Sequence, residues 1–373
     1  MLLAWAFVPE SRRPARVGPY EIIGKLGGGG MATVFLGRKT TSPGAGDLAA
    51  VKVMLADLAK ESSFVEMFAD EAKILSRLNH PNISRTLEVG HADHLGYIAM
   101  ELLLGRTLAD TWDAARAADL PFRFDLSAWI CAQVARALHC AHELCDEAGV
   151  SFELIHRDVN PSNIFLTYEG SIKLFDFGLA RTLGQKNQTK SGIVKGKVPY
   201  LSPEQLLQLR LDRRSDIFSL GTTLWELTTL TRLFKRDTDL ETILAIRDAH
   251  VPDPRALVDD YPEELWPILR RSLAQRRDDR QATAAELADQ LTTYVHSQGV
   301  DDMRGFVGAL LQRLFPGERQ KQAGWLAKMS TSPVVLDSPT IAPPAPILSV
   351  AGLRVEASAP MQLVKRKKKH EPV

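Results

Sequence analysis

Apolar residues follow two different patterns along this chain. Up to about residue 103 most of them lie in short runs separated by glycine, proline and polar residues, which is typical of β-strands. Residues 63–78 are an exception, because apolar side chains recur there every three to four positions, as on one face of a helix. From residue 104 to about residue 296 the helical spacing dominates. The pattern predicts a strand-rich first part with one main helix and a mostly helical second part.

Two apolar runs, residues 164–166 and 172–175, interrupt the helical part and flank a polar, glycine-containing turn. Two short strands around such a turn are typical of a β-hairpin. Asp158 lies before the first strand, and Asp176 follows the second. Because a hairpin brings its outer ends together, we expect these aspartates to lie in one cleft with Asn163. Carboxylate and amide oxygens suit Mg²⁺ held together with substrate phosphates, and one carboxylate is left to orient an attacking hydroxyl.

The strand-rich part contains a second set of candidate residues. Residues 27–30 are glycines between two strand-like runs, and glycines let backbone N–H groups approach phosphate oxygens. A flexible turn is the alternative interpretation of the glycines alone. Lys52 lies in the buried-looking strand 48–53, and buried lysines are rarely unpaired. Its predicted partner is Glu71 in the helix at 63–78, with a solvated helix charge as the alternative for Glu71.

Four motifs follow one another along the chain: the glycine run, Val51-Lys52-Val53, His156-Arg157-Asp158 and Asp176-Phe177-Gly178. In this combination the chain resembles the protein kinases, and more closely the bacterial serine/threonine kinases of eukaryotic type. The resemblance covers residues 20–296. It implies an α+β, two-lobed protein kinase fold, with a small β-rich N-lobe and hinge at 20–103 and a larger, mostly α-helical C-lobe at 104–296.

The resemblance also implies that ATP binds between the lobes with Mg²⁺, or with Mn²⁺ in its place. Asp158 then orients the substrate hydroxyl, while Lys52, paired with Glu71, aims at the α and β phosphates. Asn163 and Asp176 hold the metal ion. The residues expected around the nucleotide are Leu26, Gly27, Gly29, Val34, Ala50, Lys52, Met100, Glu101, Leu103 and Phe165.

Further roles in the C-lobe follow from the same resemblance. Glu204 is expected to pair with Arg280, and Asp216 is expected to cap the backbone of the His156-Arg157 turn. Residues 179–198 have loop composition and fit an activation segment, with Arg157 as a cation for a loop phosphate. The candidate phosphorylation sites in this segment are Thr182, Thr189 and Ser191.

Two positions depart from the serine/threonine kinase pattern. Asn160 stands where the family usually has a lysine that neutralises the γ-phosphate, and Lys197 stands where it usually has a threonine. These sites are neighbours in the family fold, so we hypothesise that Lys197 supplies the missing cation as a catalytic residue. An exposed loop lysine is the alternative. Ala32, in place of the third glycine of the loop, is a milder departure.

Net charge, cysteine content and the length of apolar runs exclude several classes of protein. A net charge of +1 over 373 residues gives no global field that would favour nucleic acid. The three cysteines, Cys131, Cys140 and Cys145, form no CxxC pair, which argues against a disulfide framework and a zinc site and suits a reducing compartment. No apolar run approaches the ~18–20 residues that a membrane helix needs. We expect a cytoplasmic protein without a transmembrane span.

The two ends of the chain lie outside the resemblance. Residues 1–19 are interpreted as an N-terminal extension, and residues 297–315 as an extra helix after the C-lobe. Residues 316–373 are polar and proline-rich and are expected to be disordered. They end in five cations from Lys365 to Lys369, which could contact an anionic partner; a solvated tail is the alternative.

The leading interpretation is an active protein kinase that phosphorylates serine and threonine, its own included. A pseudokinase scaffold that binds nucleotide or partner proteins without turnover is the alternative from a different class, and a small-molecule kinase of related fold is a third. The presence of Lys52, Glu71, Asp158, Asn163 and Asp176 disfavours the scaffold.

Overall fold

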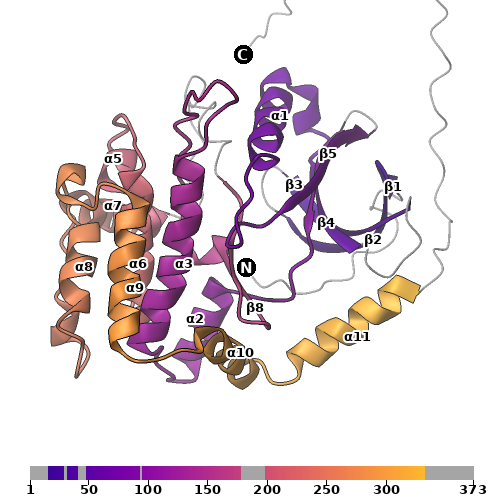
Figure 1. Cartoon of the computed structure of the whole chain (residues 1–373). Helices are drawn as coiled ribbons and strands as arrows, with labels where there is room; N and C mark the ends of the chain where they lie inside the picture. The colour runs from indigo at the N-terminus through magenta and orange to yellow at the C-terminus, as the bar shows by residue number, and fades with distance from the viewer. Residues whose placement is uncertain (1–15, 29–31, 41–47, 93–94, 178–197, 332–373) are drawn as a thin grey trace, which may run out of the picture. The chain divides into compact units, whose positions relative to one another are not determined.

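The computed structural model describes residues 16–28, 32–40, 48–92, 95–177 and 198–331. The N-lobe is an antiparallel sheet of six strands in the order β1-β2-β3-β4-β6-β5 (Figure 1). These strands are β1 Arg16–Val17, β2 Tyr20–Gly28, β3 Ala32–Lys39, β4 Leu48–Met54, β5 Thr86–Ala92 and β6 Leu95–Glu101. The sheet begins at Arg16 rather than Tyr20, because Val17 pairs with Tyr20 across a tight turn.

Strand β4 has two different faces, since successive side chains of a strand point to opposite sides. Ala49, Val51 and Val53 are buried in the apolar core on one side of the sheet. Ala50 and Lys52 therefore lie on the other side. This second face looks toward the C-lobe, because Lys52 reaches Asp176 there.

Helix α1 (Ser62–Leu75) is the main helix of the N-lobe, close to the predicted span of 63–78. Its apolar stripe includes Phe68, Ala72 and Leu75, which are buried in one core with Ile98 of β6. Packing of this stripe against the sheet fixes the rotation of the helix. This rotation places the Glu71 side chain within reach of Lys52 on β4.

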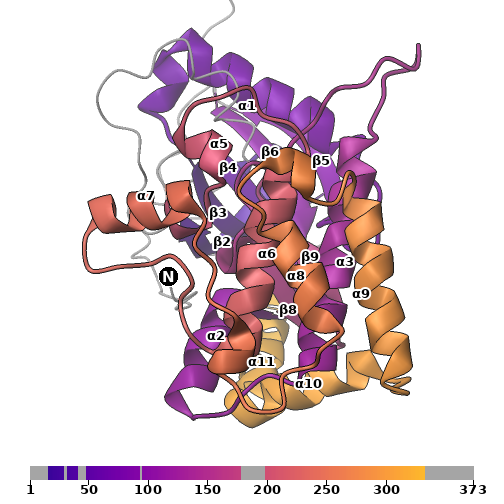
Figure 2. The ribbon, with the colours of Figure 1, turned by 90° about the vertical axis from the view of Figure 1, so that its left-hand side faces the viewer.

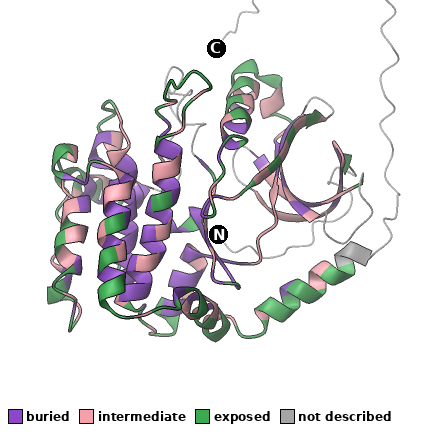
Figure 3. Cartoon of the chain, viewed as in Figure 1, coloured by how far each residue is buried: buried purple, intermediate pink, exposed green. Residues whose placement is uncertain are grey.

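The C-lobe is built mainly of helices, as predicted (Figure 2). Its helices up to residue 297 are α2 Leu108–Ala117, α3 Phe124–His142, α5 Pro203–Leu206, α6 Arg214–Thr229, α7 Asp239–Asp248, α8 Leu265–Ser272 and α9 Ala284–Ser297. The last three begin within residues 104–296, where the helical spacing predicted helices. Purple, buried residues concentrate along α3, α6 and the strands beside them (Figure 3).

Helix α6 lies in the middle of the C-lobe and is buried on all sides from Ser215 to Thr229. Its polar side chains remain satisfied because threonine hydroxyls donate to backbone carbonyls one turn earlier, such as Thr222 to Phe218 at 3.1 Å and Thr229 to Trp225 at 2.8 Å. This helix is the fixed support for the turn at His156 and Arg157, whose backbone N–H groups donate to Asp216. Within the described part of the chain, no helix is both long and apolar enough to cross a membrane.

A separate three-stranded sheet belongs to the C-lobe, with β7 (Gly105–Thr107), β8 (Ile164–Thr167) and β9 (Ile172–Leu174) in that order. The β8–β9 pair is the predicted hairpin. Its turn needs glycine at position 170, where φ is +79° and a Cβ would lie 2.2 Å from the carbonyl oxygen of Arg304.

Two helices follow α9. Helix α10 (Met303–Leu314) lies where an extra helix was predicted. Helix α11 (Glu318–Thr331) was not predicted, and the expectation of disorder from residue 316 is wrong for this segment. Most of α11 is exposed, which explains its polar composition, but Gln322 is buried and Glu318 binds Arg106 of β7 (Figure 3). Tertiary contacts rather than an apolar stripe therefore hold this helix.

Candidate active site

The hairpin brings three polar side chains of the predicted site together. The backbone N–H of Phe175 donates to the backbone carbonyl of Asn163 at 3.1 Å, which places Asp176 next to Asn163. The Asn163 amide nitrogen donates to the backbone carbonyl of Asp158 at 2.8 Å and to its Oδ2 atom at 2.9 Å. Since both bonds use Nδ2, the Oδ1 atom of Asn163 is left as an acceptor.

Lys52 connects this group to the N-lobe. Its Nζ atom lies 2.7 Å from Oε1 of Glu71, as predicted, and 3.3 Å from Oδ1 of Asp176. Burial lowers the pKa of the Lys52 amine, but the charges of Asp176 and Glu71 outweigh burial and raise that pKa above its ordinary value. Lys52 is therefore a fixed cation that two lobes hold in place.

Two residues of the site have strained backbones. Arg157 has φ +64° and Asp176 has φ +55°, both in the left-handed region that residues other than glycine rarely adopt. Such conformations persist only where surrounding contacts hold them, and they are often found at functional sites. The two strained residues flank the hairpin, one next to Asp158 and the other carrying the second carboxylate.

Asp216 holds the turn at His156 and the strained Arg157, as predicted. Its carboxylate accepts the backbone N–H groups of His156 and Arg157, both at 2.8 Å, and is 1% exposed. His142 adds a third contact, with Nε2 at 2.8 Å, which the sequence had not revealed. Burial raises the pKa of the Asp216 carboxyl, but the His142 contact and the other hydrogen bonds outweigh it and lower that pKa.

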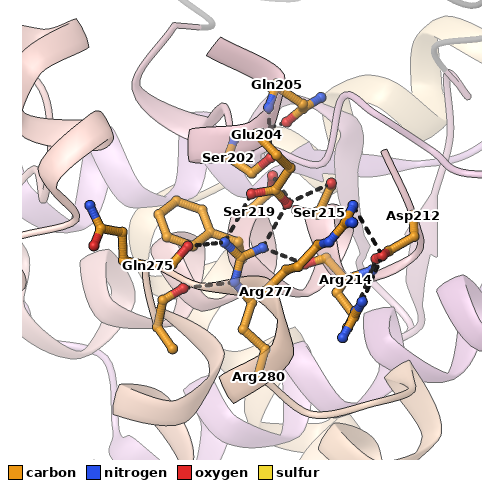
Figure 4. Close-up of polar contacts among 12 residues, drawn as sticks. Ser202, Glu204, Gln205, Asp212, Arg214, Ser215, Ser219, Gln275, Arg277 and Arg280 are labelled. Atoms are coloured by element: carbon orange, nitrogen blue, oxygen red, sulfur yellow. Dashed lines mark hydrogen bonds and ion pairs between the residues drawn. The ribbon is translucent and has the colours of Figure 1, made fainter. Parts of the chain in front are cut away.

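Glu204 and Arg280 form the predicted ion pair. The guanidinium donates from both terminal nitrogens, at 2.7 Å to Oε1 and 3.0 Å to Oε2 of the carboxylate (Figure 4). Its remaining N–H groups donate to backbone carbonyls of Ala274, Gln275 and Arg214. Burial raises the pKa of the Glu204 carboxyl, but the hydrogen bonds and the charge of Arg280 outweigh burial and lower that pKa below its ordinary value. This pair fastens the segment that begins at Val198 to the body of the C-lobe.

Several contacts of the site were not predicted from the sequence. Tyr200 donates its hydroxyl to Glu226 at 2.7 Å, and Arg232 binds the same carboxylate at 2.7 Å. Gln205 donates to the backbone carbonyl of Arg157 at 2.9 Å. A signal existed for Glu226, because a carboxylate at a buried position of a helix requires a partner. No local pattern identifies Tyr200 as a partner, because it lies on another segment.

Several of the residues expected around a nucleotide share one side of the N-lobe sheet, whereas Glu101 pairs with Ala49 and lies on the other side. Gly27 pairs with Val34, and Ala50 pairs with Met100. All four are partly exposed, and so are Leu26, Glu101 and Leu103, whereas Phe165 of β8 is buried. The Glu101 side chain is already engaged, since it accepts from Lys173 at 2.7 Å and from the backbone N–H of Arg85 at 2.9 Å.

Some predicted residues lie outside the described part of the chain. These are Gly29, Lys197, the candidate phosphorylation sites Thr182, Thr189 and Ser191, and the cations from Lys365 to Lys369. Asn160 is described and is 2% exposed. Its side chain donates to the backbone carbonyl of Asp158 at 2.8 Å and accepts from the N–H of Ser162 at 2.9 Å. Asn160 therefore shapes the loop that carries Asp158 and presents no cation.

A cavity of about 570 Å³ lies elsewhere, between α2 and the segment that follows α6. It is lined by cations such as Arg116 and Lys235 and by anions such as Asp113 and Glu241. None of the candidate catalytic residues lines it. Its mixture of charges favours no class of ligand.

In comparisons with known proteins, the family model that matches this chain and two of its curated relatives all belong to the protein kinases. The family model described as "Protein kinase domain" matches residues 20–294. "Tyrosine-protein kinase MasK" of Myxococcus xanthus is 38% identical over 316 residues, which are 84% of this chain and 49% of that protein. "Serine/threonine-protein kinase PknB" of Mycolicibacterium smegmatis is 35% identical over 294 residues, 76% of this chain and 44% of that protein. The chain thus spans about half, or less, of the length of these curated relatives.

The solved structures lead to the same family. The kinase domain of PknI from Mycobacterium tuberculosis superposes with a TM-score of 0.55 at 26% identity, covering 74% of this chain and 97% of that domain. Similarity of both sequence and fold therefore extends over the two lobes. Helix α11 lies beyond the residues that the family model matches.

Proposed function

Since this chain belongs to the protein kinase family, we propose that it transfers the γ-phosphate of ATP to serine and threonine hydroxyls of proteins, its own included. The observation that carries this proposal is the Lys52 amine, held 2.7 Å from Glu71 and 3.3 Å from Asp176. A fixed cation between two lobes, next to oxygen donors from the hairpin, suits a polyphosphate bound with a metal ion.

In this proposal the adenine lies against the face of the sheet that carries Ala50 and Met100, with Phe165 on its other side. The partial exposure of Ala50 and Met100 supports this placement. Leu103 makes no backbone hydrogen bond within the described part of the chain, so its N–H and C=O groups can pair with the base. The phosphates then extend below the glycine strand toward Lys52.

Asn163 and Asp176 are the proposed ligands of Mg²⁺, or of Mn²⁺ in its place. The Oδ1 atom of Asn163 fits this role, because Nδ2 makes both of the hydrogen bonds to Asp158. The described residues contain no cluster of three or more histidine, cysteine or acidic side chains, so phosphate and water oxygens would complete the shell. When bound, the ion would neutralise phosphate charge.

Asp158 is the proposed residue that orients the substrate hydroxyl. The hydroxyl oxygen forms a bond to the γ-phosphorus, the bond between that phosphorus and the bridging oxygen of ADP breaks, and the hydroxyl proton passes to Asp158. The Asn163 amide, 2.9 Å from Oδ2 of Asp158, holds the carboxylate in position. Most of the rate enhancement then comes from positioning and charge stabilisation.

Serine and threonine are proposed as acceptors because most of the kinases that resemble this chain carry serine/threonine names, although MasK is named a tyrosine kinase. The test is incubation of the purified protein with Mg²⁺, γ-labelled ATP and a generic protein substrate, followed by phosphoamino-acid analysis. Label on phosphoserine or phosphothreonine supports the proposal. Label confined to phosphotyrosine would overturn the acceptor class while leaving kinase activity intact.

Phosphorylation of the segment after Gly178 is part of the proposal. The Nε atom of Arg157 is buried and makes no hydrogen bond to the described residues, and burial lowers the pKa of this guanidinium. A phosphate on Thr182, Thr189 or Ser191 would supply the missing anionic partner. Mapping the labelled peptides of the autophosphorylated protein identifies the site, and label found only elsewhere would contradict this assignment.

Two further assignments rest on the sequence. The free cysteines, of which Cys131 is buried, suit the reducing cytoplasm as the place of action. The cations from Lys365 to Lys369 suit an anionic partner. Fractionation of cells, and binding of a peptide with this sequence to acidic vesicles, would test them.

A nucleotide-binding scaffold without turnover is the second candidate function. The observation that favours it is Asn160, whose side chain is used entirely in the catalytic loop where a lysine is usual in the family. Binding of Mg²⁺-ATP without any transfer of label in the same assay would support the scaffold and reject the kinase.

A further inference from the structure

Helix α11 contacts both lobes, although it lies outside the matched kinase family region (Figure 1). Glu318, Gln322 and Trp325 are spaced by four and three positions, so they lie on one face of the helix. The first two contact the C-lobe, and the third contacts the N-lobe. This face therefore spans the two lobes over roughly 10 Å of helix.

The C-lobe end of α11 is anchored at β7, the strand that follows the hinge. Arg106 binds Glu318 at 2.7 Å, and its side chain is only 10% exposed. The Arg106 guanidinium also lies 4.9 Å from the centre of the Phe315 ring. One turn further along the helix, the buried Gln322 side chain donates to the carbonyl of Gly105 at 3.4 Å. These contacts fix the start of α11 relative to the C-lobe.

The other end of this face meets the N-lobe at Gly24 of β2. A Cβ atom placed on Gly24 would lie 3.6 Å from the Trp325 ring, so the ring packs on the backbone of this glycine. Gly24 pairs with Leu36, which pairs with Ala50, which pairs with Met100. Directly paired residues share one face of a sheet. Trp325 therefore reaches the face that carries Ala50 and Lys52, the face that looks toward the C-lobe.

We propose that α11 is an integral part of the nucleotide site and that Trp325 is a positioning residue for ATP, acting through β2. The proposal rests on the proposed function, since it takes the face with Ala50 and Met100 as the adenine site. Strand β2 continues from Gly24 into Leu26 and Gly27, the expected cover of the nucleotide. A ring packed on Gly24 from a helix anchored in the C-lobe holds this strand at one distance from the hairpin.

The consequence is a preorganised site. Without Trp325, the glycine strand and the spacing of the lobes would become fixed only when nucleotide binds. The entropy lost in that ordering would weaken the affinity for nucleotide. Transfer from a fully occupied site would change little, because Lys52, Asp158, Asn163 and Asp176 make their contacts independently of α11. The expected signature is a change in the Kd and KM for ATP with little change in kcat.

The test uses the full chain and titration with Mg²⁺-ADP and Mg²⁺-ATP. Trp325→Ala should raise the Kd about tenfold, which corresponds to about 1.4 kcal/mol, while kcat at saturating ATP stays within about twofold. Trp325→Phe, which keeps a ring, should restore most of the affinity. Gln320→Ala, an exposed change on the same helix, is the matched control and should behave as wild type.

A second variant approaches the contact from the other side. Gly24→Leu places a side chain where the Trp325 ring lies, so it should displace the ring. The backbone of Gly24 is outside the left-handed region and therefore permits a residue with a side chain. Gly24→Leu should weaken nucleotide binding alone but add little in the Trp325→Ala background. Equal losses in both backgrounds, or a Kd of Trp325→Ala within about twofold of wild type, would overturn the proposal.

Other outcomes are also decisive. A parallel fall in melting temperature, kcat and affinity in Trp325→Ala that phenylalanine does not rescue would mean that α11 only stabilises the fold, and would reject the positioning role. Failure of the wild-type protein to bind nucleotide at all would instead reject the proposed function, so the two failures are distinguishable.

Discussion

Lys52 and Glu71 lie 2.7 Å apart and join β4 to α1 at the point where the N-lobe faces Asp176. Glu71 is 5% exposed, so the pair is largely shielded from water. Because the position of the Lys52 amine depends on this contact, Glu71→Gln should lower kcat/KM for ATP by roughly 10²-fold. Steady-state kinetics of label transfer from ATP provides the measurement.

The control for this variant is an ion pair in the same lobe. Lys60 and Asp57 lie 3.0 Å apart with side chains 75% and 94% exposed. Exposed ion pairs contribute little to the stability of the fold, and this pair includes no residue of the candidate site, so Asp57→Asn should leave kcat/KM unchanged. Equal effects of Glu71→Gln and Asp57→Asn would contradict a specific role for the Lys52–Glu71 pair.

The Glu204–Arg280 pair predicts a stability effect. Arg280→Met would leave a buried carboxylate without its partner, so the free energy of unfolding should fall by about 3–5 kcal/mol. The double variant Glu204→Leu with Arg280→Met should lose less, since no unpaired charge remains. Urea unfolding measures both, and Arg276→Ala, at a site 76% exposed, is the control with no measurable loss expected. A double variant less stable than Arg280→Met would be the contrary result.

Asp216 predicts a dependence of stability on pH. Its folded pKa lies below the ordinary value of 3.8, so its contribution is fully present above that value and is lost as the pH falls through the lowered pKa. Asp216→Asn should cost about 1–3 kcal/mol near neutral pH, because an amide cannot accept from both backbone N–H groups as well as from His142. Urea unfolding from about pH 7 to about pH 3 should show this difference shrinking in acid. A constant difference would argue against the lowered pKa.

Lys197 carries a prediction from the sequence alone. If it supplies the cation that Asn160 does not, Lys197→Ala should lower kcat by roughly 10²-fold with little change in the Kd for ATP. Lys190→Ala, a lysine of the same segment, is the matched control and should keep the wild-type turnover. Single-turnover transfer from labelled ATP separates kcat from binding. Unchanged turnover in Lys197→Ala would make it an ordinary loop lysine.

Much of the fold and part of the site follow from local sequence patterns. The β8–β9 hairpin was predictable because two short apolar runs flank a glycine turn, and the hairpin alone brings Asn163 next to Asp176. The need of Lys52 for a partner was predictable because a lysine in a buried strand is rarely unpaired, whereas the choice of Glu71 came from the resemblance. The Glu204–Arg280 pair and the cap at Asp216 came from resemblance to a family rather than from spacing.

The rest depends on contacts between distant segments. Helix α11 was missed because its sequence is polar, and its stability comes from Arg106 and Gly24, more than two hundred residues earlier in the chain. The link of Glu226 to Tyr200 was missed for a similar reason, since Tyr200 lies on an earlier segment of the chain. Local propensity carries no information about such pairings, so only the folded structure reveals them.

The central claim is that Asp158, held by Asn163, orients a hydroxyl for attack on ATP. The most direct measurement is single-turnover transfer of labelled γ-phosphate by the wild-type protein and by Asp158→Asn, with the Kd for Mg²⁺-ATP measured in parallel. The account predicts transfer by the wild type, a loss of about 10²–10⁴-fold in the variant, and nearly equal nucleotide affinities. Equal transfer rates for the two proteins, or binding without transfer by the wild type, would contradict it.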